Sequence, residues 1–481
     1  MKNHYIPQFI IKAFNEKPFY YDLEKGEIVK KRAHKAFFKV DFYDDETEKK
    51  INEDIETSFS NLLRNKLNGE TVFLTREEVD LIKRYMRLTS IRTMGETEFA
   101  IKLKGFLENA KRYSEIMEHI NKETWTLLKE KKTIADLGIA DRELYMLALK
   151  RYSSVSSDEL LTDVDVPLEL YVWGLTFDIS YLTFWEAPES RQFVLTDCGM
   201  NSEYEGVRHL LGAGFDCSKT SYLYWLLQNG TDDEKGVASC YLAYSYSMFE
   251  NFDFFPVSNT RMIVAVHPFF RAFFPNQLVN RERQTIFQSS PDIWPTCLQN
   301  QGLFEPPECN YVSFGKVEPG DVFTYRRKEL TTYESDYLNY LMINYAKKAI
   351  AYDDPEKVKI SLLTAFLGET MIKTETTKKH YDEIKDWPWN IGFGKSQIEP
   401  LIKQLFQNGL KSWDLFVAKM SFEAINAGRL RDFRENPYVA DFFLKNPDYL
   451  DIDRAFGFLG SKEERKHALE EIAKPLTPED A

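Results

Sequence analysis

Residues 3–14 read NHYIPQFIIKAF and place a histidine, two kinds of aromatic ring and a proline-led apolar turn at the front of the chain. Chain termini are usually polar and mobile. Here Pro7 suits the first position of a helix, where its missing N–H is no loss, and Phe9 begins an apolar helix face. His4 and Gln8 lie four residues apart at the helix entrance, so we expect both to point towards one place. The pattern predicts a buried terminus that carries polar groups into the core.

Composition limits the class of protein. The chain has 481 residues, of which 43% are hydrophobic and 15% aromatic, so it is long enough for two or more domains and too apolar for intrinsic disorder. Its net charge of −13 argues against general binding to duplex DNA, although a local basic patch is compatible with that average. The five scattered cysteines lack CxxC spacing, which favours a reducing cytoplasm over a disulfide framework. With no signal-peptide pattern and no apolar run long enough to span a bilayer, we expect a cytoplasmic protein without a membrane partner.

A hairpin and a basic run follow the first helix. Residues 17–29 contain two short strand-like segments around the turn Glu24-Lys25-Gly26. Residues 30–35 then carry four basic side chains and a histidine. This run is either a patch that faces phosphate or a solvated edge strand whose lysines prevent edge-to-edge pairing.

Two amphipathic helices carry the next candidates. The spacing of apolar residues predicts a helix over 51–63, with Glu56 beside its apolar stripe. Thr75 and Glu78 form a capping box that starts a long helix, and Arg92 falls on the buried face of that helix. A buried guanidinium needs a carboxylate or phosphate partner. The pattern is compatible with an internal Glu56–Arg92 salt bridge and with a substrate site.

The middle of the chain mixes helices and strands. Residues 97–170 and 201–250 have mainly helical patterns, and we interpret them as helical insertions. Between them, residues 181–185 and 191–196 flank an Ala-Pro-Glu-Ser turn, which predicts a hairpin that ends at Asp197. The strand 261–267 is expected to pair beside this hairpin.

A domain boundary is expected at the helix-breaking Asp353-Asp354-Pro355. We therefore predict an α+β domain over residues 1–352, mostly helical with a small antiparallel sheet from the 17–29 and 181–197 hairpins and the 261–267 strand. Residues 353–481 are expected to form an all-α carboxy-terminal domain. Gly394-Lys395-Ser396 is no phosphate loop, because the required earlier glycine is Trp389 and no apolar strand precedes it.

The opening motif resembles the HYxPQFxLxxF-like start of a mostly bacterial family, domain of unknown function 4238. The resemblance continues at Glu56, at Arg92, at the strand that ends in Asp197 and at Asn344 in a later helix, and it covers about residues 1–352. The residues after Asp197 depart from the family pattern, because Cys-Gly-Met replaces a proline-containing tail. The resemblance implies an architecture and a set of site residues, but no activity.

The candidate site combines the polar residues of these separate segments: His4, Gln8, Glu56, Arg92, Asp197 and Asn344. Two carboxylates and an imidazole are able to hold a divalent metal while Arg92 neutralises a phosphate, which suggests a phosphodiesterase or nuclease. In a second version His4 is a general base oriented by Asp197. Both versions describe a hydrolase acting on a phosphoester, a nucleotide or a nucleic acid, and we hypothesise a bacterial defence or toxin effector.

The alternative is a recognition module without catalysis. In that interpretation the six polar side chains satisfy one another and fix the fold. The aromatic middle or the carboxy-terminal domain then binds a protein or nucleic acid. The two hypotheses differ in whether the cluster faces an open cavity or is closed.

Overall fold

The structure, a computed structural model, describes most of the first 362 residues. The described segments are 2–40, 44–107, 122–154, 157–203, 252–267, 278–280, 285–287, 301–313 and 318–358, with single residues between 108 and 121 and at 361, 362 and 401. Helices were predicted over residues 201–250, of which 201–203 form a strand and the rest lie outside the described residues. The all-α domain predicted over 353–481 also lies outside them, apart from the few residues named. Within them the fold is α+β, as the sequence predicted.

A five-stranded sheet forms the centre of the fold, in the order β15-β6-β10-β9-β8. All its pairings are antiparallel except that of β15 with β6. The strands are β6 (Tyr181–Glu186), β8 (Asn201–Glu203), β9 (Phe252–Pro256), β10 (Arg261–Val266) and β15 (Lys328–Glu329). Nearly every residue of β6, β9 and β10 is buried, so these strands are covered on both faces and read as continuous apolar runs.

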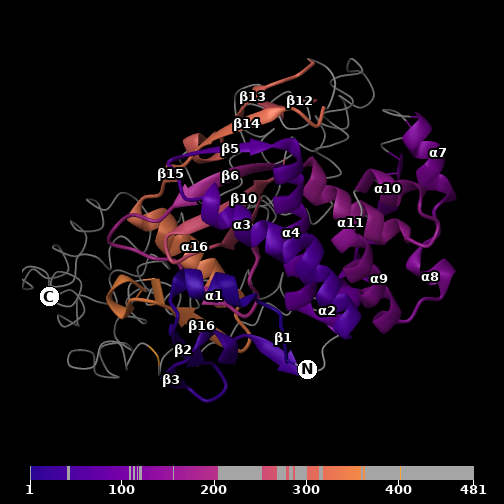
Figure 1. The fold of residues 1–481 in the computed structure, drawn as a ribbon. Helices are drawn as coiled ribbons and strands as arrows, with labels where there is room; N and C mark the ends of the chain where they lie inside the picture. The colour runs from indigo at the N-terminus through magenta and orange to yellow at the C-terminus, as the bar shows by residue number, and fades with distance from the viewer. Residues whose placement is uncertain are drawn as a thin grey trace, which may run out of the picture.

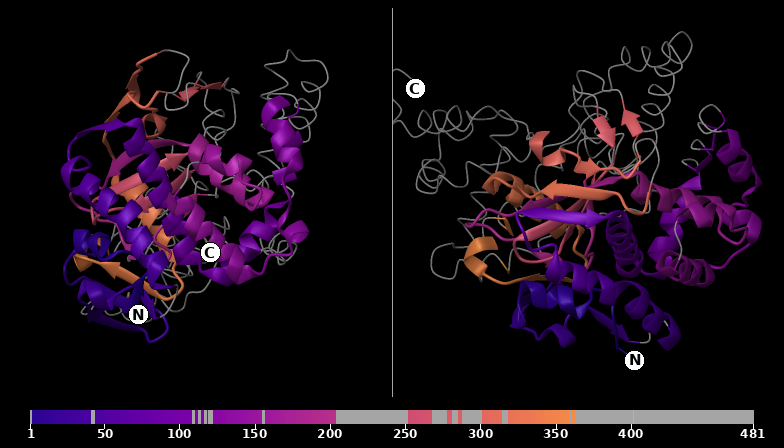
Figure 2. Two further views of the ribbon diagram at one scale, coloured as in Figure 1. Left: turned by 45° about the vertical axis from the view of Figure 1, so that its right-hand side comes forward. Right: turned by 45° about the horizontal axis from the view of Figure 1, so that its top comes forward.

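A second, four-stranded antiparallel sheet joins distant parts of the chain, in the order β3-β2-β16-β7. The predicted amino-terminal hairpin is present as β2 (Phe19–Asp22) and β3 (Glu27–Lys30). Strand β16 (Ala349–Tyr352) inserts between β2 and β7 (Leu195–Thr196). Residues near 350, in orange, therefore lie directly beside the indigo amino-terminal elements (Figures 1 and 2).

The predicted hairpin over residues 181–197 is wrong. Its two halves belong to different sheets, because β6 pairs with β10 whereas β7 pairs with β16. The single small sheet predicted from both hairpins and the 261–267 strand is therefore wrong as well. One part of the prediction is confirmed, since β10 does pair with the first half of the proposed hairpin. Asp197 does follow the second strand.

The remaining strands of the described residues form three smaller antiparallel sheets. They are β1 (Lys2–His4) with β4 (Phe38–Val40); β13 (Glu308–Asn310), β14 (Val322–Arg326) and β5 (Thr71–Thr75); and β11 (Leu278–Asn280) with β12 (Thr285–Phe287). The first of these sheets pairs the very start of the chain with the residues that follow the basic run.

Helices cover the sheets and build a separate helical side of the molecule, right of α4 in Figure 1. The helical elements are α1 (Gln8–Phe14), η1 (Ala33–Lys35), α2 (Asp45–Ile51), η2 (Asn52–Glu56), α3 (Thr57–Asn65), α4 (Arg76–Met94), α5 (Glu96–Gly105), α7 (Lys122–Glu130), α8 (Ile134–Leu137), α9 (Asp141–Ser154), α10 (Ser157–Thr162), α11 (Leu168–Ile179), η3 (Gln301–Phe304) and α16 (Thr332–Tyr345). The described residues between 97 and 170 are mainly helical, whereas their being an insertion stays a prediction. No helix among the residues described here is long and apolar enough to cross a membrane.

Helix α4 is the central helix of the fold. It begins at the predicted capping box, in which Thr75 and Glu78 each accept the other's backbone N–H. It packs against α3, α5, α9 and α11, and this explains why most of its side chains are buried, charged ones included. Arg87 pairs with Asp178 of α11 at 3.1 Å. Because a buried charge is costly unless paired, such contacts fix how α11 sits on α4.

Candidate functional site

The amino-terminal histidine lies in a strand rather than at the entrance of a helix. His4 ends β1, whereas Gln8 is the first residue of α1 and Pro7 is its N-cap. The predicted placement of His4 and Gln8 on one helix entrance is therefore wrong. The His4 Nδ1–H donates to the carbonyl of Ala36 at 3.1 Å. Burial lowers the pKa of this half-buried imidazole, and the positive charge of Arg92 lowers it further.

Arg92 connects three elements from a buried position. Its guanidinium, in a residue only 1% exposed, pairs with the carboxylate of Glu56 and donates to the backbone carbonyl of His4. A second carboxylate, that of Glu48, lies 4.0 Å away. Burial raises the pKa of Glu56 and the Arg92 charge opposes that rise. Both terminal nitrogens of Arg92 are thus used on protein acceptors, which favours the internal salt bridge over a substrate clamp.

Asp197 is an anchor for backbone N–H groups. Its Oδ1 atom accepts hydrogen bonds from three successive residues, Lys347 at 2.9 Å, Lys348 at 3.1 Å and Ala349 at 3.3 Å. Among the described residues, the side-chain partner of His4 is Ala36 and not Asp197. The structure therefore does not pair this imidazole with this carboxylate. Asp197 instead fixes the start of β16, the strand that pairs with the amino-terminal hairpin.

Asn344, the last predicted site residue, lies near the end of α16, and its side chain is outside the described part of the structure. The sequence analysis missed Asn339, five residues earlier in the same helix. Its fully buried amide donates to the carbonyl of Gln192 at 2.8 Å and accepts the N–H of Val194 at 3.0 Å. Asn339 thereby holds the segment before β7. An asparagine next to an apolar helix stripe was the only sequence signal for it.

A cavity of about 230 Å³ opens where the amino-terminal hairpin, η1, β4 and the start of β16 meet. We call it the lysine–tyrosine pocket. It is lined by Tyr5, Tyr20, Asp22, Glu24, Lys31, Lys35, Phe37, Phe38, Lys39 and Lys348. None of these side chains belongs to the six predicted from the sequence, although Tyr5 is part of the opening motif and Lys31 and Lys35 belong to the basic run.

The base of the lysine–tyrosine pocket is aromatic. The ring of Phe37 lies 6.2 Å from that of Tyr5, edge to face, and 5.4 Å from that of Tyr20. All three side chains are buried, and Phe37 has a φ of +49°. A bulky residue in this left-handed region is strained by roughly 1–2 kcal/mol. The surrounding contacts thus hold the Phe37 ring between the two tyrosines against a backbone preference.

Lysines cover this aromatic base. The Lys31 ammonium lies 3.5 Å from the ring centroid of Tyr20, and the Lys39 ammonium lies 5.6 Å from that of Tyr5. Burial lowers the pKa of both lysines. Burial also raises the pKa of both tyrosines, and the Asp197 charge adds to that rise, so both phenols stay protonated donors. Within the described residues, no ion pair joins Lys31, Lys35 or Lys348 to a carboxylate.

Three of the six predicted site residues support the backbone around this pocket. His4 holds the Ala36 carbonyl, and the next residue, Tyr5, donates its backbone N–H to the Phe37 carbonyl at 3.2 Å. Arg92 in turn holds the His4 carbonyl. On the opposite wall, Asp197 binds the backbone of Lys348. Thus His4, Arg92 and Asp197 support the backbone around the cavity, whereas other side chains, among them Tyr5 of the opening motif, face it.

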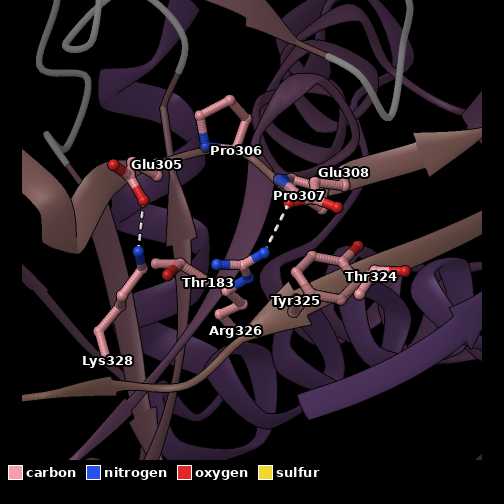
Figure 3. A pocket seen from close by; sticks show the side chains of 9 residues that line it. All are labelled: Thr183, Glu305, Pro306, Pro307, Glu308, Thr324, Tyr325, Arg326 and Lys328. Atoms are coloured by element: carbon pink, nitrogen blue, oxygen red, sulfur yellow. Dashed lines mark hydrogen bonds and ion pairs between the residues drawn. The ribbon is translucent and has the colours of Figure 1, made fainter.

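A second cavity, of about 120 Å³, lies at the edge of the central sheet (Figure 3). Its cations are already paired, since Lys328 contacts Glu305 and Arg326 contacts Glu308, as the dashed lines show. Figure 3 places these two pairs on either side of the opening beneath Pro306 and Pro307. Its charges therefore cancel locally, whereas within the described residues Lys31, Lys35 and Lys348 of the lysine–tyrosine pocket form no ion pair with a carboxylate.

The model of a family described as a protein of unknown function (DUF4238) matches residues 2–356. The chain belongs to this family. Every residue that lines the lysine–tyrosine pocket falls within the matched region. Neither the curated proteins nor the solved structures gave a match. For this DUF4238 protein, chemistry must therefore be inferred from the site itself.

The divalent metal was one of two versions of the site in the sequence analysis, and it has no preformed cluster in the part of this DUF4238 protein that the structure describes. No group of three or more His, Cys, Asp or Glu side chains there is placed to hold a metal ion. The carboxylates that line the same cavity as the lysines are those of Asp22 and Glu24, at the turn of the amino-terminal hairpin. A divalent ion at this point would need oxygen ligands from a bound phosphate as well.

Proposed function

We propose that this DUF4238 protein binds a phosphate-bearing nucleotide, or the phosphorylated end of a nucleic acid, in the lysine–tyrosine pocket. The observation that carries the proposal is the convergence of four lysines on one cavity. They come from β4, from η1, from the segment between β3 and η1, and from the residue before β16. Lysine is a common phosphate ligand, and protonated phenols add hydrogen-bond donors. This is the recognition alternative, with the polar network of Arg92 as structural support.

The charge distribution supports a small or terminal ligand rather than a long duplex. The chain as a whole carries a net charge of −13, which disfavours contact with an extended phosphate backbone. A cavity of about 230 Å³ is at the small end for a ligand site, so it suits a mononucleotide or one end of a strand. The local cluster of ammonium groups then attracts phosphate against the general field of the protein.

Hydrolysis of the bound phosphoester is the second candidate, and the position of Asp22 and Glu24 favours it. Both carboxylates line the same cavity as the lysines. A carboxylate beside a bound phosphate is able to act as a general base towards water, or to share a divalent metal with the phosphate. This version retains the hypothesis of a nucleotide- or nucleic-acid-directed effector that acts in the cytoplasm of bacteria.

Calorimetric titration with adenosine and its mono-, di- and triphosphates tests binding. We expect the phosphates to bind and adenosine to bind far more weakly. Lys31→Gln and Lys348→Gln should each weaken phosphate binding about tenfold, because hydrogen bonds to charged groups contribute roughly 1.5–3 kcal/mol. The matched control is Lys328→Gln, which removes the same charge at the second cavity. Equal affinities in all three variants would overturn the proposal.

Phosphate release in the presence of Mg²⁺ or Mn²⁺ tests hydrolysis separately. Asp22→Asn and Glu24→Gln should lower the rate while the nucleotide still binds. Glu305→Gln, at the second cavity, serves as the control carboxylate. Release that is unchanged in the first two variants excludes these carboxylates from the chemistry.

A further inference from the structure

We propose that strand β5 is an interaction surface through which two copies of this chain associate, by antiparallel pairing of β5 with β5 of the second copy. β5 is an edge strand, because the order of its sheet is β13-β14-β5. An edge strand presents unpaired backbone N–H and C=O groups to any strand that approaches. The strand shares no residue with the lysine–tyrosine pocket, so this inference does not depend on the proposed function.

The backbone hydrogen bonds at the two ends of β5 show which of its groups point outward. The Arg76 N–H donates to the carbonyl of Asp321 at 3.1 Å, and the Arg327 N–H donates to that of Glu70 at 2.8 Å. Both pairs continue the register of β5 on β14. Hydrogen-bonded pairs alternate with non-hydrogen-bonded pairs along an antiparallel ladder. The even-numbered residues of β5 therefore bond to β14, and the odd-numbered residues point their backbone groups the other way.

Two residues at the outer edge of β5 thus offer backbone groups to a further strand. They are Thr71 and Phe73, since the Thr75 N–H already donates to the Glu78 carboxylate. Among the described residues, none forms a hydrogen bond with the N–H or C=O group of Thr71 or Phe73. The strand also carries no charged side chain and no proline, the features that usually keep edge strands from pairing.

The outward groups are self-complementary, which identifies a second copy of the chain as the partner. In an antiparallel pair with Val72 of each copy opposite the other, Thr71 lies opposite Phe73 of the second copy, and Phe73 lies opposite its Thr71. Each copy then supplies two N–H and two C=O groups, which form four hydrogen bonds and leave none of these groups unused. The two three-stranded sheets thereby join into one sheet of six strands.

The side chains at the outer face of β5 suit the same pairing. Phe73 is 57% exposed, and Thr71 is exposed on the same face of the strand, whereas Val72 and Leu74 are buried on the other face. In the proposed pair each Phe73 ring packs on the Thr71 side chain of the second copy. Pairs of an aromatic with a β-branched residue across strands stabilise sheets. The pairing therefore covers an exposed phenyl ring as well as the exposed backbone groups.

Sedimentation velocity on the full chain, between about 1 and 100 µM, tests the association. We expect a monomer–dimer equilibrium within this range. Phe73→Lys and Thr71→Lys should each weaken the dimer about tenfold, because each copy then brings an ammonium group to the shared edge. Both side chains are exposed, so the melting temperature should stay near that of the unmodified protein. Val164→Lys is the matched control, since Val164 is 79% exposed and lies between α10 and α11.

Hydrogen–deuterium exchange locates the interface. Exchange in the peptide that contains residues 70–75 should slow at the concentration at which the dimer forms, because the Thr71 and Phe73 amides become hydrogen-bonded. A chain that stays monomeric overturns the proposal and leaves β5 to an extended segment of another protein. A dimer that persists unweakened in both lysine variants, or that leaves exchange at residues 70–75 unchanged, overturns it as well.

Discussion

The Oδ1 atom of Asp197 accepts the backbone N–H of Lys348 at 3.1 Å, and the side chain of Lys348 lines the lysine–tyrosine pocket. The aspartate that closes β7 therefore acts on the pocket through the backbone of β16 rather than through its own chemistry. It binds the N–H groups of the residues on either side of Lys348 as well. A single carboxylate thus sets the position of one wall lysine.

Asp197→Ala should destabilise the protein by about 2–4 kcal/mol, because it removes a buried charged acceptor from three backbone donors. Asp197→Asn keeps one acceptor oxygen and should lose less. Urea unfolding measures both effects, and nucleotide titration of the folded variants should show weaker phosphate binding. Unchanged stability with lost phosphate release would instead identify Asp197 as a chemical participant.

Removing only one partner of the Glu56–Arg92 ion pair should strongly destabilise the folded protein. Glu56→Ala leaves the guanidinium of Arg92 buried without its carboxylate, which typically reduces stability by about 3–5 kcal/mol. Replacing both residues by apolar ones, as in Glu56→Leu/Arg92→Met, should lower stability by less than the sum of the two single changes. Guanidinium chloride unfolding of the four proteins gives the coupling energy. Strict additivity would contradict a direct pair.

The imidazole of His4 should make stability depend on pH. Its ordinary pKa is 6.5 and burial lowers that value in the folded protein. Between the two values the unfolded chain binds a proton that the folded chain does not, so stability falls as pH drops below about 6.5. His4→Gln should remove this part of the decrease. Thermal unfolding at several pH values between 7.5 and 5 compares the two proteins, and identical pH profiles would contradict the prediction.

At Phe37, glycine should be a less destabilising substitution than alanine, whereas alanine is usually the less destabilising of the two. Both Phe37→Ala and Phe37→Gly lose a buried ring, which typically reduces stability by about 3–5 kcal/mol. At a φ of +49°, however, alanine retains the backbone strain of a left-handed conformation, whereas glycine, which has no Cβ atom, adopts this conformation without strain. Phe37→Gly should therefore be more stable than Phe37→Ala by about 1 kcal/mol. Equilibrium unfolding decides the order, and the usual advantage of alanine would argue against a left-handed Phe37.

Local features of the fold could be predicted from the sequence. The capping box at Thr75 and the amphipathic spacing after it identified α4, and the turn at Gly26 identified the β2–β3 hairpin. The prediction of a hairpin over residues 181–197 was wrong for a physical reason. Each half pairs with a strand far away in the chain, and a turn-like sequence between two apolar runs carries no information about such partners.

The site was predictable only in part. The sequence left the Glu56–Arg92 salt bridge open as an alternative, and it marked Lys31 and Lys35 as a basic run with two interpretations. Lys348 had no sequence signal, because its place in the pocket depends on the insertion of β16 beside β2. The candidate residues His4, Arg92 and Asp197 are supports of the pocket rather than its lining, because buried hydrogen bonds restrict residue type as strictly as ligand contacts do.

The pairing of β16 with β2 has a consequence for biosynthesis. The amino-terminal hairpin leaves the ribosome before its neighbour in the sheet, residues 349–352, which are translated more than 300 residues later. Until then β2 has an uncovered side, and the cavity beside it lacks one wall. The cavity can therefore form only after residues 349–352 have emerged, and a product released early by a premature stop codon would lack one of its walls.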